Sequence, residues 1–547
     1  MKEIVKKLRG LLKKNGAYAI LINSTNEFLI EYNELSKNLR YKVTGFSGST
    51  GDALLTLDKL YLFVDGRYHE QADIEVDKKN VTVVKLKMTE PYIKTLISKI
   101  KKNSVVLINA STISQQFLKS LESHLCAKKS KVELIDMKNI IQSSKSTYES
   151  KSIEIISVPD SISAKNADNK HHNFCCNLKD NEYTILTTIE DIAYLTNLRS
   201  FYIPYSSSFC AKAILSKKNA VIFCDLDLPN IGKKYRQMPL GSFSNELGEI
   251  QNSNIFINKK SINANDYNAI NSSNNIFESD FSNLKTVKFD TEINHLKYAF
   301  TKTDDALTII KDMIDSNKIY SELDFYNQLE QSFYQNEAIA LSFKPIVAAG
   351  KNSSIIHYSH SSNDVYLEDG SLLLVDCGAY YNGGYATDIT RTFIKGKPTI
   401  KQKQVYTTVL KAFFAAYHSS YTKESTWFDI DKKARSMINR FKINGFEFSH
   451  STGHGVGLSV HESPPFVSPS SVSKTPVYKN AVFTIEPGIY KKNYGGVRLE
   501  NTIYSDIIND KVKLTSFSKF PFEEKLVDFK MLTRKETGYF EKWQEQS

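Results

Sequence analysis

The sequence of 547 residues predicts two related α/β domains followed by an α+β domain. Residues 53–65 (ALLTLDKLYLFVD) align without a gap with residues 213–225 (AILSKKNAVIFCD), and residues 18–28 resemble residues 183–195 at nearly the same offset. Such a repeat indicates the internal duplication of one α/β module. Beyond the repeat, pairs of strand-like segments alternate with helical patterns, which is typical of an α+β domain.

We place the three domains at residues 1–145, 153–284 and 287–547. Residues 142–152 are rich in Ser and Lys and poor in apolar residues, which indicates a linker between the first two domains. Domains of these lengths are each large enough to have a hydrophobic core of their own.

In the first domain, helical and strand patterns alternate. Residues 1–16 form a basic amphipathic helix without the apolar core and cleavage site of a secretory signal. The chain has no apolar stretch of about 18 residues, so we expect no membrane partner. The other elements expected in this domain are strands at 18–23, 105–109 and 131–136, a hairpin at 53–65 and a helix at 111–125.

Four helices are predicted in the third domain, at residues 295–314, 321–333, 401–418 and 427–444. The second of them begins with Ser321 and Asp324, which have the spacing of a capping pair. The last is expected to stop at Gly445, because glycine readily adopts the left-handed conformation that ends a helix.

Charge and cysteine content exclude several classes of protein. The net charge of +11 is spread over many lysines, and no basic and aromatic motif of a nucleic-acid reader occurs, so we expect no nucleic-acid partner. The six cysteines lack the spacing of a disulfide framework, which favours a reducing, cytoplasmic compartment. The cluster His171, His172, Cys175 and Cys176 could bind a transition metal, but adjacent pairs do not easily converge on one ion. We favour a surface loop that enters a strand.

The candidate functional residues lie in two predicted hairpins and in the segment between them. The first, residues 371–393, carries Asp376 and Asp388 on its two arms, with turn residues at 382–384. The second, residues 481–504, carries Glu486 and Glu500. The Gly-rich segment HSTGHGVGLSVHESP between them contains three histidines: His450, His454 and His461.

Four carboxylates and an imidazole at close range predict a metal site, because like charges a few ångströms apart raise one another's pKa strongly. A donor set dominated by carboxylates with one histidine suits manganese, and cobalt or zinc could also bind. Bridging carboxylates would let five ligands hold two ions.

The motifs DCGAYYNGGYATDITRT, HSTGHGVG, VHE, TIEPGIY and VRLEN, in this order, resemble those of the Xaa-Pro aminopeptidases (aminopeptidase P) of metallopeptidase family M24. The resemblance implies a pita-bread catalytic domain behind two domains like the creatinase N-terminal domain. It also implies hydrolysis of the first bond of peptides with proline in second position, in a homodimer.

The resemblance assigns roles to individual residues. Asp376 would bind one ion, and His454 and Glu486 would complete the second. Asp388 and Glu500 would bridge both ions. A bridging water would attack the scissile carbonyl, and Glu486 would move its proton to the leaving nitrogen.

Further residues would contact the substrate or orient the ligands. His357 and His461 would contact substrate and assist catalysis, and His450 would line the proline pocket. Arg498 would orient Asp376 or its neighbour and lie in the substrate site.

The chain departs from the family pattern at two places. The interval from Asp376 to Asp388 is one residue longer than expected, and Ser451 stands where glycine is common. Two alternatives stay open: a prolidase that cleaves only Xaa-Pro dipeptides, and a non-catalytic module of the same fold that binds protein or nucleic acid.

Overall fold

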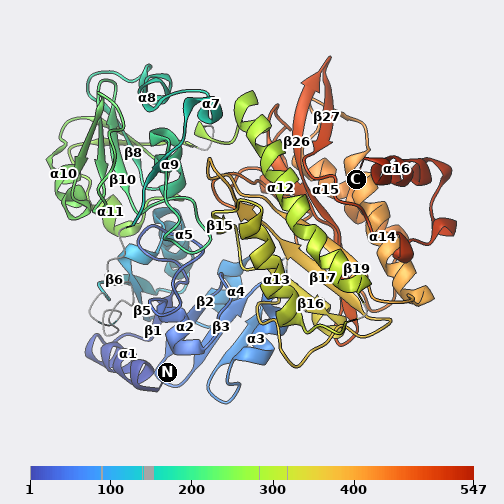
Figure 1. The fold of residues 1–547 in the computed structure, drawn as a ribbon. Coiled ribbons are helices and arrows are strands. Elements are labelled where there is room, and N and C mark those ends of the chain that lie inside the picture. Colours follow the sequence, from blue (N-terminus) through green and yellow to red (C-terminus); the bar gives the residue numbers. More distant parts are fainter. Residues whose placement is uncertain are drawn as a thin grey trace. The chain divides into compact units, whose positions relative to one another are not determined.

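The computed structural model describes residues 2–87, 90–137, 140, 153–281, 284–316 and 318–546 (Figure 1). The chain forms two compact units, of which the first comprises Met1–Ser157 and Lys165–Phe281 and the second Val158–Ala164 and Ser282–Ser547. The linker predicted at 142–152 lies outside the described residues, and the exact domain boundaries stay predictions.

The first unit contains a six-stranded sheet in the order β4-β3-β2-β1-β5-β6. β1 pairs antiparallel with β2 and parallel with β5. The strands and the amphipathic N-terminal helix expected here are confirmed. The elements are α1 (Lys2–Lys14), β1 (Ala19–Ile22), α2 (Leu39–Thr44), β2 (Asp52–Thr56), β3 (Leu60–Val64), α3 (His69–Glu75), β4 (Thr82–Lys85), α4 (Tyr92–Ser98), β5 (Val105–Asn109), α5 (Gln115–Cys126) and β6 (Lys131–Ile135).

A second six-stranded sheet in the same unit repeats this topology in the order β12-β11-β10-β8-β13-β14. β8 pairs antiparallel with β10 and parallel with β13, as β1 does with β2 and β5. The two hairpins aligned in the sequence are β2–β3 and β10–β11, so the duplication is confirmed in the fold. The elements are α8 (Ala167–Cys175), β8 (Glu182–Leu186), α9 (Ile189–Thr196), β10 (Lys212–Ser216), β11 (Ala220–Phe223), β12 (Tyr235–Met238), α10 (Phe243–Glu249), β13 (Asn254–Ile257), α11 (Ala264–Ala269) and β14 (Asn275–Glu278).

The surface loop expected around His171 is wrong, because this segment forms helix α8. His171 and Cys175, four residues apart, lie on one helix face and are buried, whereas His172 is exposed. Among the described residues, no third His, Cys, Asp or Glu joins them in a group that could hold a metal. The pair therefore belongs to the core of the second sheet domain.

The second unit is built on a seven-stranded sheet in the order β16-β17-β19-β26-β27-β20, with β23 also paired to β26. In Figure 1, α12 and α13 run in front of β16, β17 and β19. The elements are α12 (Asp290–Asp315), α13 (Glu322–Gln335), β16 (Ile346–Ala349), β17 (Leu372–Cys377), β19 (Ile389–Ile394), α14 (Ile400–Tyr417), β20 (Tyr421–Thr422), α15 (Trp427–Arg440), β23 (Val482–Ile485), β26 (Glu500–Ile508), β27 (Lys511–Ser516) and α16 (Arg534–Glu545).

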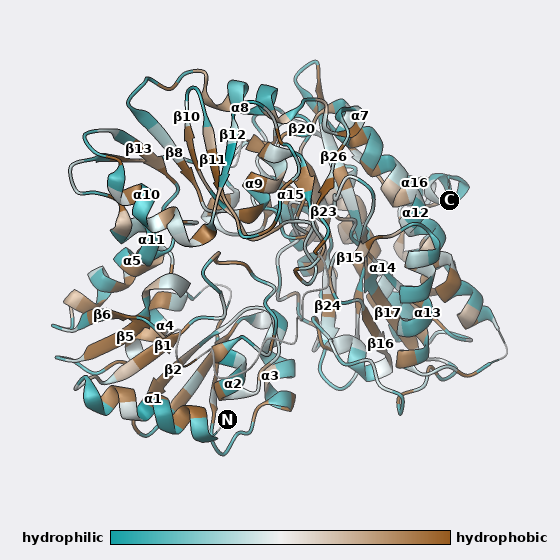
Figure 2. Ribbon diagram, turned by 60° about the vertical axis from the view of Figure 1, so that its left-hand side comes forward, coloured by the Kyte–Doolittle hydropathy of each residue, from teal (hydrophilic) through white to brown (hydrophobic). Residues whose placement is uncertain are grey.

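The largest core cluster of this unit joins α14 and α15 to the sheet. Phe413 and Trp427 of the helices pack with Leu372, Phe483 and Val497 from the strands and the hairpin beside them. Figure 2 shows hydrophobic residues along most of β17, whereas turns of α1 alternate between hydrophilic and hydrophobic. The strands and the two helices thus share one hydrophobic core.

The four predicted helices are present, and their bounds differ most at the start of α12, which begins five residues before the predicted position, and at the end of α15. Ser321 and Asp324 form the expected capping box of α13. Helix α15 ends at Arg440, four residues before the predicted end, and Phe441 N–H closes its last turn on Met437 O. Gly445, with a φ of +79°, lies in the next turn rather than at the helix end.

The first predicted hairpin is confirmed, and the second is divided into two parts. β17 and β19 pair antiparallel, and the connection contains a turn in which Gly383 and Gly384 have φ values of +100° and +72°. The second hairpin is interrupted at Glu486 and Leu499: β23 pairs with β26, while β24 (Gly488–Lys491) pairs with β25 (Gly495–Arg498). Glu486 therefore lies between β23 and β24, and its N–H donates to Thr452 O at 2.7 Å.

Among the described residues, no helix has the length and apolar content needed to cross a membrane. All six cysteines are free thiols.

Candidate metal centre

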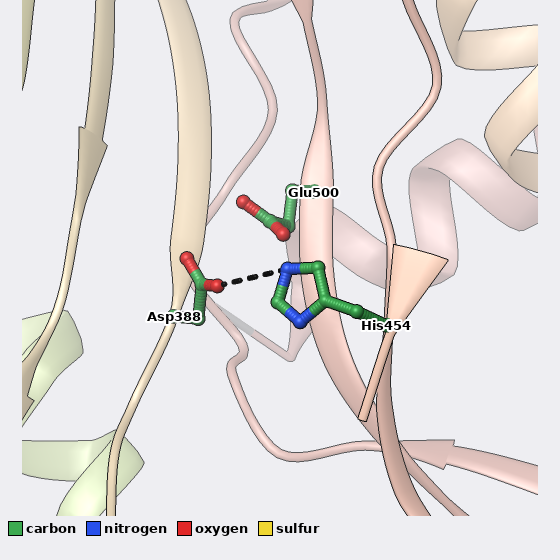
Figure 3. Close-up of side chains that lie close together, drawn as sticks. All are labelled: Asp388, His454 and Glu500. Carbon is green, nitrogen blue, oxygen red and sulfur yellow. Dashed lines mark ion pairs between the residues drawn. The ribbon is translucent and has the colours of Figure 1, made fainter. Parts of the chain in front are cut away.

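Asp388, His454 and Glu500 lie together in the second unit, each with a ligand atom within 4.8 Å of the others' (Figure 3). Asp388 directly precedes β19, His454 ends the two-residue strand β21 (Gly453–His454), and Glu500 begins β26. His454 Nε2 lies 3.5 Å from Asp388 Oδ2. Three segments far apart in the sequence thus meet at one point.

The register of the sheet brings the carboxylates together. Asp376 on β17 lies opposite Thr390 on β19, which in turn lies opposite Glu500 on β26. Thr390 Oγ1 donates a hydrogen bond of 2.6 Å to Glu500 Oε2. The carbonyl oxygen of Asp388 accepts a bond of 2.8 Å from Thr502 Oγ1, which fixes the backbone at the site.

Asp376 and Glu486, the other two predicted ligands, lie at the edges of this cluster. Arg498 Nη2 donates to Asp376 Oδ2 at 2.6 Å, and the Arg498 side chain is 2% exposed. Glu486 Oε1 lies 3.8 Å from His454 Nε2. The expected role of Arg498 beside Asp376 agrees with this contact.

Burial and mutual repulsion disfavour the ionised forms of Asp388 and Glu500. Burial, together with Glu500 and Asp376, raises the pKa of Asp388 well above its usual range. Burial and the charge of Asp376 raise the pKa of Glu500 to about 8. A bound cation would relieve both effects by neutralising the excess negative charge.

The donor set fits a divalent cation. Among the described residues, Asp376 Oδ1 and Asp388 Oδ1 are buried oxygens without a hydrogen-bond partner, an arrangement that is costly unless another ligand satisfies them. Oxygen donors with one imidazole are those that manganese and similar divalent ions prefer.

Tyr490 belongs to the site and was not predicted from the sequence. Arg498 Nη1 donates to Tyr490 Oη at 2.8 Å, and Tyr490 Oη lies 2.9 Å from His450 Nε2. Burial raises the pKa of Tyr490, so the phenol stays protonated. Gly488 and Gly496 leave the space that the Tyr490 side chain occupies, because a Cβ on either would lie 2.3 Å from it.

The non-ligand histidines surround the cluster. His450 is buried, with Nδ1 2.8 Å from Ser451 O and 3.8 Å from Glu486 Oε2. The His461 ring lies edge-on to the His454 ring at a centroid distance of 4.6 Å. His357 follows Ile356, whose carbonyl accepts a bond of 3.4 Å from Arg498 Nη1. Their roles stay predictions.

Three family models match consecutive parts of the chain. Residues 294–505 match the metallopeptidase family M24, and residues 4–144 and 147–292 match two models of the creatinase/prolidase N-terminal domain. The group formed by Asp388, His454 and Glu500 lies within the first of these matches. Residues 294–505 therefore form a domain of metallopeptidase family M24. The predicted family and fold class are therefore confirmed.

Two similar proteins match this chain over nearly its whole length. Xaa-Pro aminopeptidase 1 of Dictyostelium discoideum is 28% identical over 98% of this chain and 90% of its own length. A probable Xaa-Pro aminopeptidase P of Laccaria bicolor is 27% identical over 99% and 89%.

Two solved structures give the extent of the structural likeness. The X-prolyl aminopeptidase of Caenorhabditis elegans, described as a cytosolic enzyme with a di-nuclear active site, covers 100% of this chain and 95% of its own, with a TM-score of 0.89 and 21% identity. An Xaa-Pro dipeptidase of Bacillus anthracis covers 65% of this chain and 99% of its own, with a TM-score of 0.55 and 26% identity.

Proposed function

We propose that this chain is a metal-dependent aminopeptidase that hydrolyses the bond between an N-terminal residue and a proline in second position. The observation that carries the proposal is the convergence of Asp388, His454 and Glu500. The two N-terminal sheet domains support it further, because relatives named Xaa-Pro aminopeptidase match nearly the full chain.

Five side chains would hold two divalent ions, for which manganese is our choice: Asp376, Asp388, His454, Glu486 and Glu500. Divalent ions bound there would supply Lewis-acid chemistry, which acidifies water and polarises a carbonyl group. The di-nuclear active site of the Caenorhabditis elegans enzyme supports two ions rather than one.

The chain's own residues would handle substrate and protons. Glu486, outside the regular strands, would take a proton from the attacking water and deliver it to the leaving proline nitrogen. His461, edge-on to His454, would hold the substrate carbonyl oxygen. Arg498 would hold the Asp376 side chain in a fixed orientation, since its guanidinium binds that carboxylate at 2.6 Å.

Selection for proline follows from the chemistry of the bond. An Xaa-Pro bond has no N–H and a fixed ring, so peptidases that bind that N–H cannot act on it. His450, packed against Phe448 at a ring distance of 5.0 Å and against Tyr490, would form part of a compact wall for the proline ring.

The second candidate function is prolidase activity on dipeptides. A solved Xaa-Pro dipeptidase covers 99% of its own length but 65% of this chain, so it lacks a counterpart for about one third of the residues. The additional N-terminal domain favours the aminopeptidase, which must accept longer peptides.

The test uses the peptides Arg-Pro-Pro, Arg-Ala-Ala and Arg-Pro with metal-stripped protein, before and after addition of manganese. We expect arginine release from Arg-Pro-Pro alone, dependent on the metal and absent in Asp388→Ala. Cleavage of the dipeptide alone would instead assign a prolidase. Absence of both cleavage and metal binding would favour the non-catalytic module.

The proposal includes a cytoplasmic homodimer. The Caenorhabditis elegans enzyme of the same fold is described as cytosolic, which supports the compartment. Light scattering coupled to size exclusion would measure the mass of the assembly against the 62.2 kDa of one chain.

A further inference from the structure

Glu322, the first residue of α13, is a buried carboxylate remote from the metal ligands in sequence. Its exposed fraction is 0%. Both oxygens are used as acceptors, and all four donors come from a single stretch, residues 349–362. Oε1 accepts from Ala349 N at 2.7 Å and Asn352 Nδ2 at 3.0 Å, while Oε2 accepts from Tyr358 Oη at 2.6 Å and Ser362 N at 3.1 Å.

These four donors bracket His357 along the chain. Two precede the histidine and two follow it, and Tyr358 is its direct neighbour. On the other side of the histidine, Ile356 O accepts from Arg498 Nη1. Both neighbours of His357 are therefore held in place, Tyr358 through its side-chain bond to Glu322 and Ile356 through its carbonyl bond to Arg498.

Glu322 itself has a fixed position. It stands at the first position of α13, whose start is closed by the Ser321–Asp324 capping box, and its own N–H donates to Val365 O at 2.9 Å. An ionised carboxylate suits four donors because it offers two acceptor oxygens and no proton. A glutamine at this place would set an NH₂ group against one pair of donors.

We propose that Glu322 is a positioning residue for His357: its carboxylate gathers residues 349–362 into the one arrangement that aims the His357 ring at the substrate. The inference rests on the proposed function, in which His357 contacts substrate. It adds a residue that touches neither metal nor substrate and acts through a loop. Such supporting contacts change activity by about 10- to 100-fold when removed.

A double-mutant cycle tests the coupling. The variants are Glu322→Gln, His357→Ala and both together, assayed on Arg-Pro-Pro at matched metal content. We expect Glu322→Gln to lower kcat/KM about 10- to 100-fold in the native background and less than about 2-fold in His357→Ala. Equal losses in both backgrounds would overturn the proposal.

Tyr358→Phe serves as a second variant if Glu322→Gln folds poorly. It removes one donor to Glu322 and leaves the buried carboxylate and its other three bonds in place. A smaller loss of kcat/KM in the same direction is expected, again only while His357 is present. A loss that persists in His357→Ala would contradict the proposal.

A readout independent of peptide cleavage separates this inference from the proposed function. Hydrogen–deuterium exchange should accelerate within 349–362 in Glu322→Gln at least about 10-fold, because one of the two backbone donors, Ala349 N or Ser362 N, loses its acceptor and the stretch is held less firmly. The matched control is Asp304→Asn, another largely buried carboxylate, which accepts from Ser518 Oγ and Lys519 N elsewhere in the unit. Unchanged exchange at 349–362 would overturn the inference, whether or not the native protein cleaves the peptide.

Discussion

At the scale of single residues, Asp388 has the most demanding environment in the site. It is 4% exposed, its Oδ1 has no hydrogen-bond partner among the described residues, and three other carboxylates raise its pKa. A neutral, protonated Asp388 would be tolerated in the absence of metal. An ionised Asp388 needs a cation, so this residue links metal binding directly to charge.

Replacing Asp388 by Asn tests that link. The amide keeps the shape but cannot supply a negative ligand, so we expect bound metal to be lost and kcat/KM on Arg-Pro-Pro to fall at least about 100-fold. Metal content by mass spectrometry and peptide kinetics measure the two effects. Asp506→Asn is the matched control, since Asp506 lies on β26 but pairs with exposed Lys479. Full metal content in Asp388→Asn would refute its role as a ligand.

Replacing Arg498 by lysine tests whether the geometry of this side chain matters as well as its charge. Its two terminal nitrogens reach Asp376 and Tyr490 at the same time, which the single ammonium of lysine cannot reproduce. We expect Arg498→Lys to weaken metal affinity or kcat/KM about 10- to 100-fold while the net charge is unchanged. Competitive titration with a chelator measures the affinity. A lysine variant with native affinity and activity would show that charge alone suffices.

At the scale of elements, the glycines of the Gly-rich segment let its backbone lie directly against strand β23. A Cβ at Gly453 would lie 1.9 Å from Thr484 O on β23, and the next residue, His454, donates its N–H to Thr484 Oγ1 at 3.2 Å. Strand β21 can therefore place His454 beside Asp388 and Glu500 only if residue 453 has no side chain.

Gly453→Ala should displace β21 from β23 and His454 with it. We expect destabilisation by about 1–3 kcal/mol, as for other overpacked sites, together with a loss of metal binding. Thermal unfolding and metal titration provide the measurements. Gly538→Ala is the control: it lies inside α16 with nothing within 4 Å of the added Cβ, so it should stabilise by about 0.5–1 kcal/mol. The same sign of change in both variants would disprove the argument.

Elements could be predicted wherever a local pattern decides them. The apolar run before Asp376 and the glycines at 383 and 384 predicted the strand and the turn of the first hairpin. The end of α15 was predicted too late because Gly445 was taken as the stop, although the helix already ends at Arg440. Helix α8 was not predicted, because the adjacent histidines and cysteines resemble a ligand cluster and obscure the helical spacing of His171 and Cys175.

The same distinction applies to the site. The five candidate ligands could be proposed because their motifs are short and occur in a fixed order, and three of them, Asp388, His454 and Glu500, lie together in the structure. Tyr490 and Glu322 could not, since each has partners that only the folded chain brings close: His450 for Tyr490 and the 349–362 stretch for Glu322. Long-range hydrogen bonds leave little trace in a single sequence.

At the scale of the whole molecule, metal binding and folding should be coupled. The second unit buries Asp388 and Glu500, whose raised pKa values keep them partly protonated in the absence of a cation. The unfolded chain has no such constraint and ionises these groups at ordinary pKa values. The stability of the metal-free protein must therefore depend on pH, and metal must stabilise it by binding the folded state alone.

The direction of this pH dependence follows from the raised pKa of Glu500, which is about 8 in the folded chain and ordinarily 4.5. The stability contributed by its protonated form is complete below pH 4.5 and is lost as the pH rises towards 8. We expect the Tm of the metal-free protein to fall over this window, and the rise in Tm on adding manganese to be larger near pH 8 than near pH 5.5, because binding displaces protons. Thermal unfolding in a chelator, and again with manganese, measures both. Glu500→Gln cannot ionise, so it should flatten the metal-free slope by roughly 1 kcal/mol per pH unit in this window. A native slope in Glu500→Gln, or a metal-free Tm that increases with pH, would show that this carboxylate is ionised without metal.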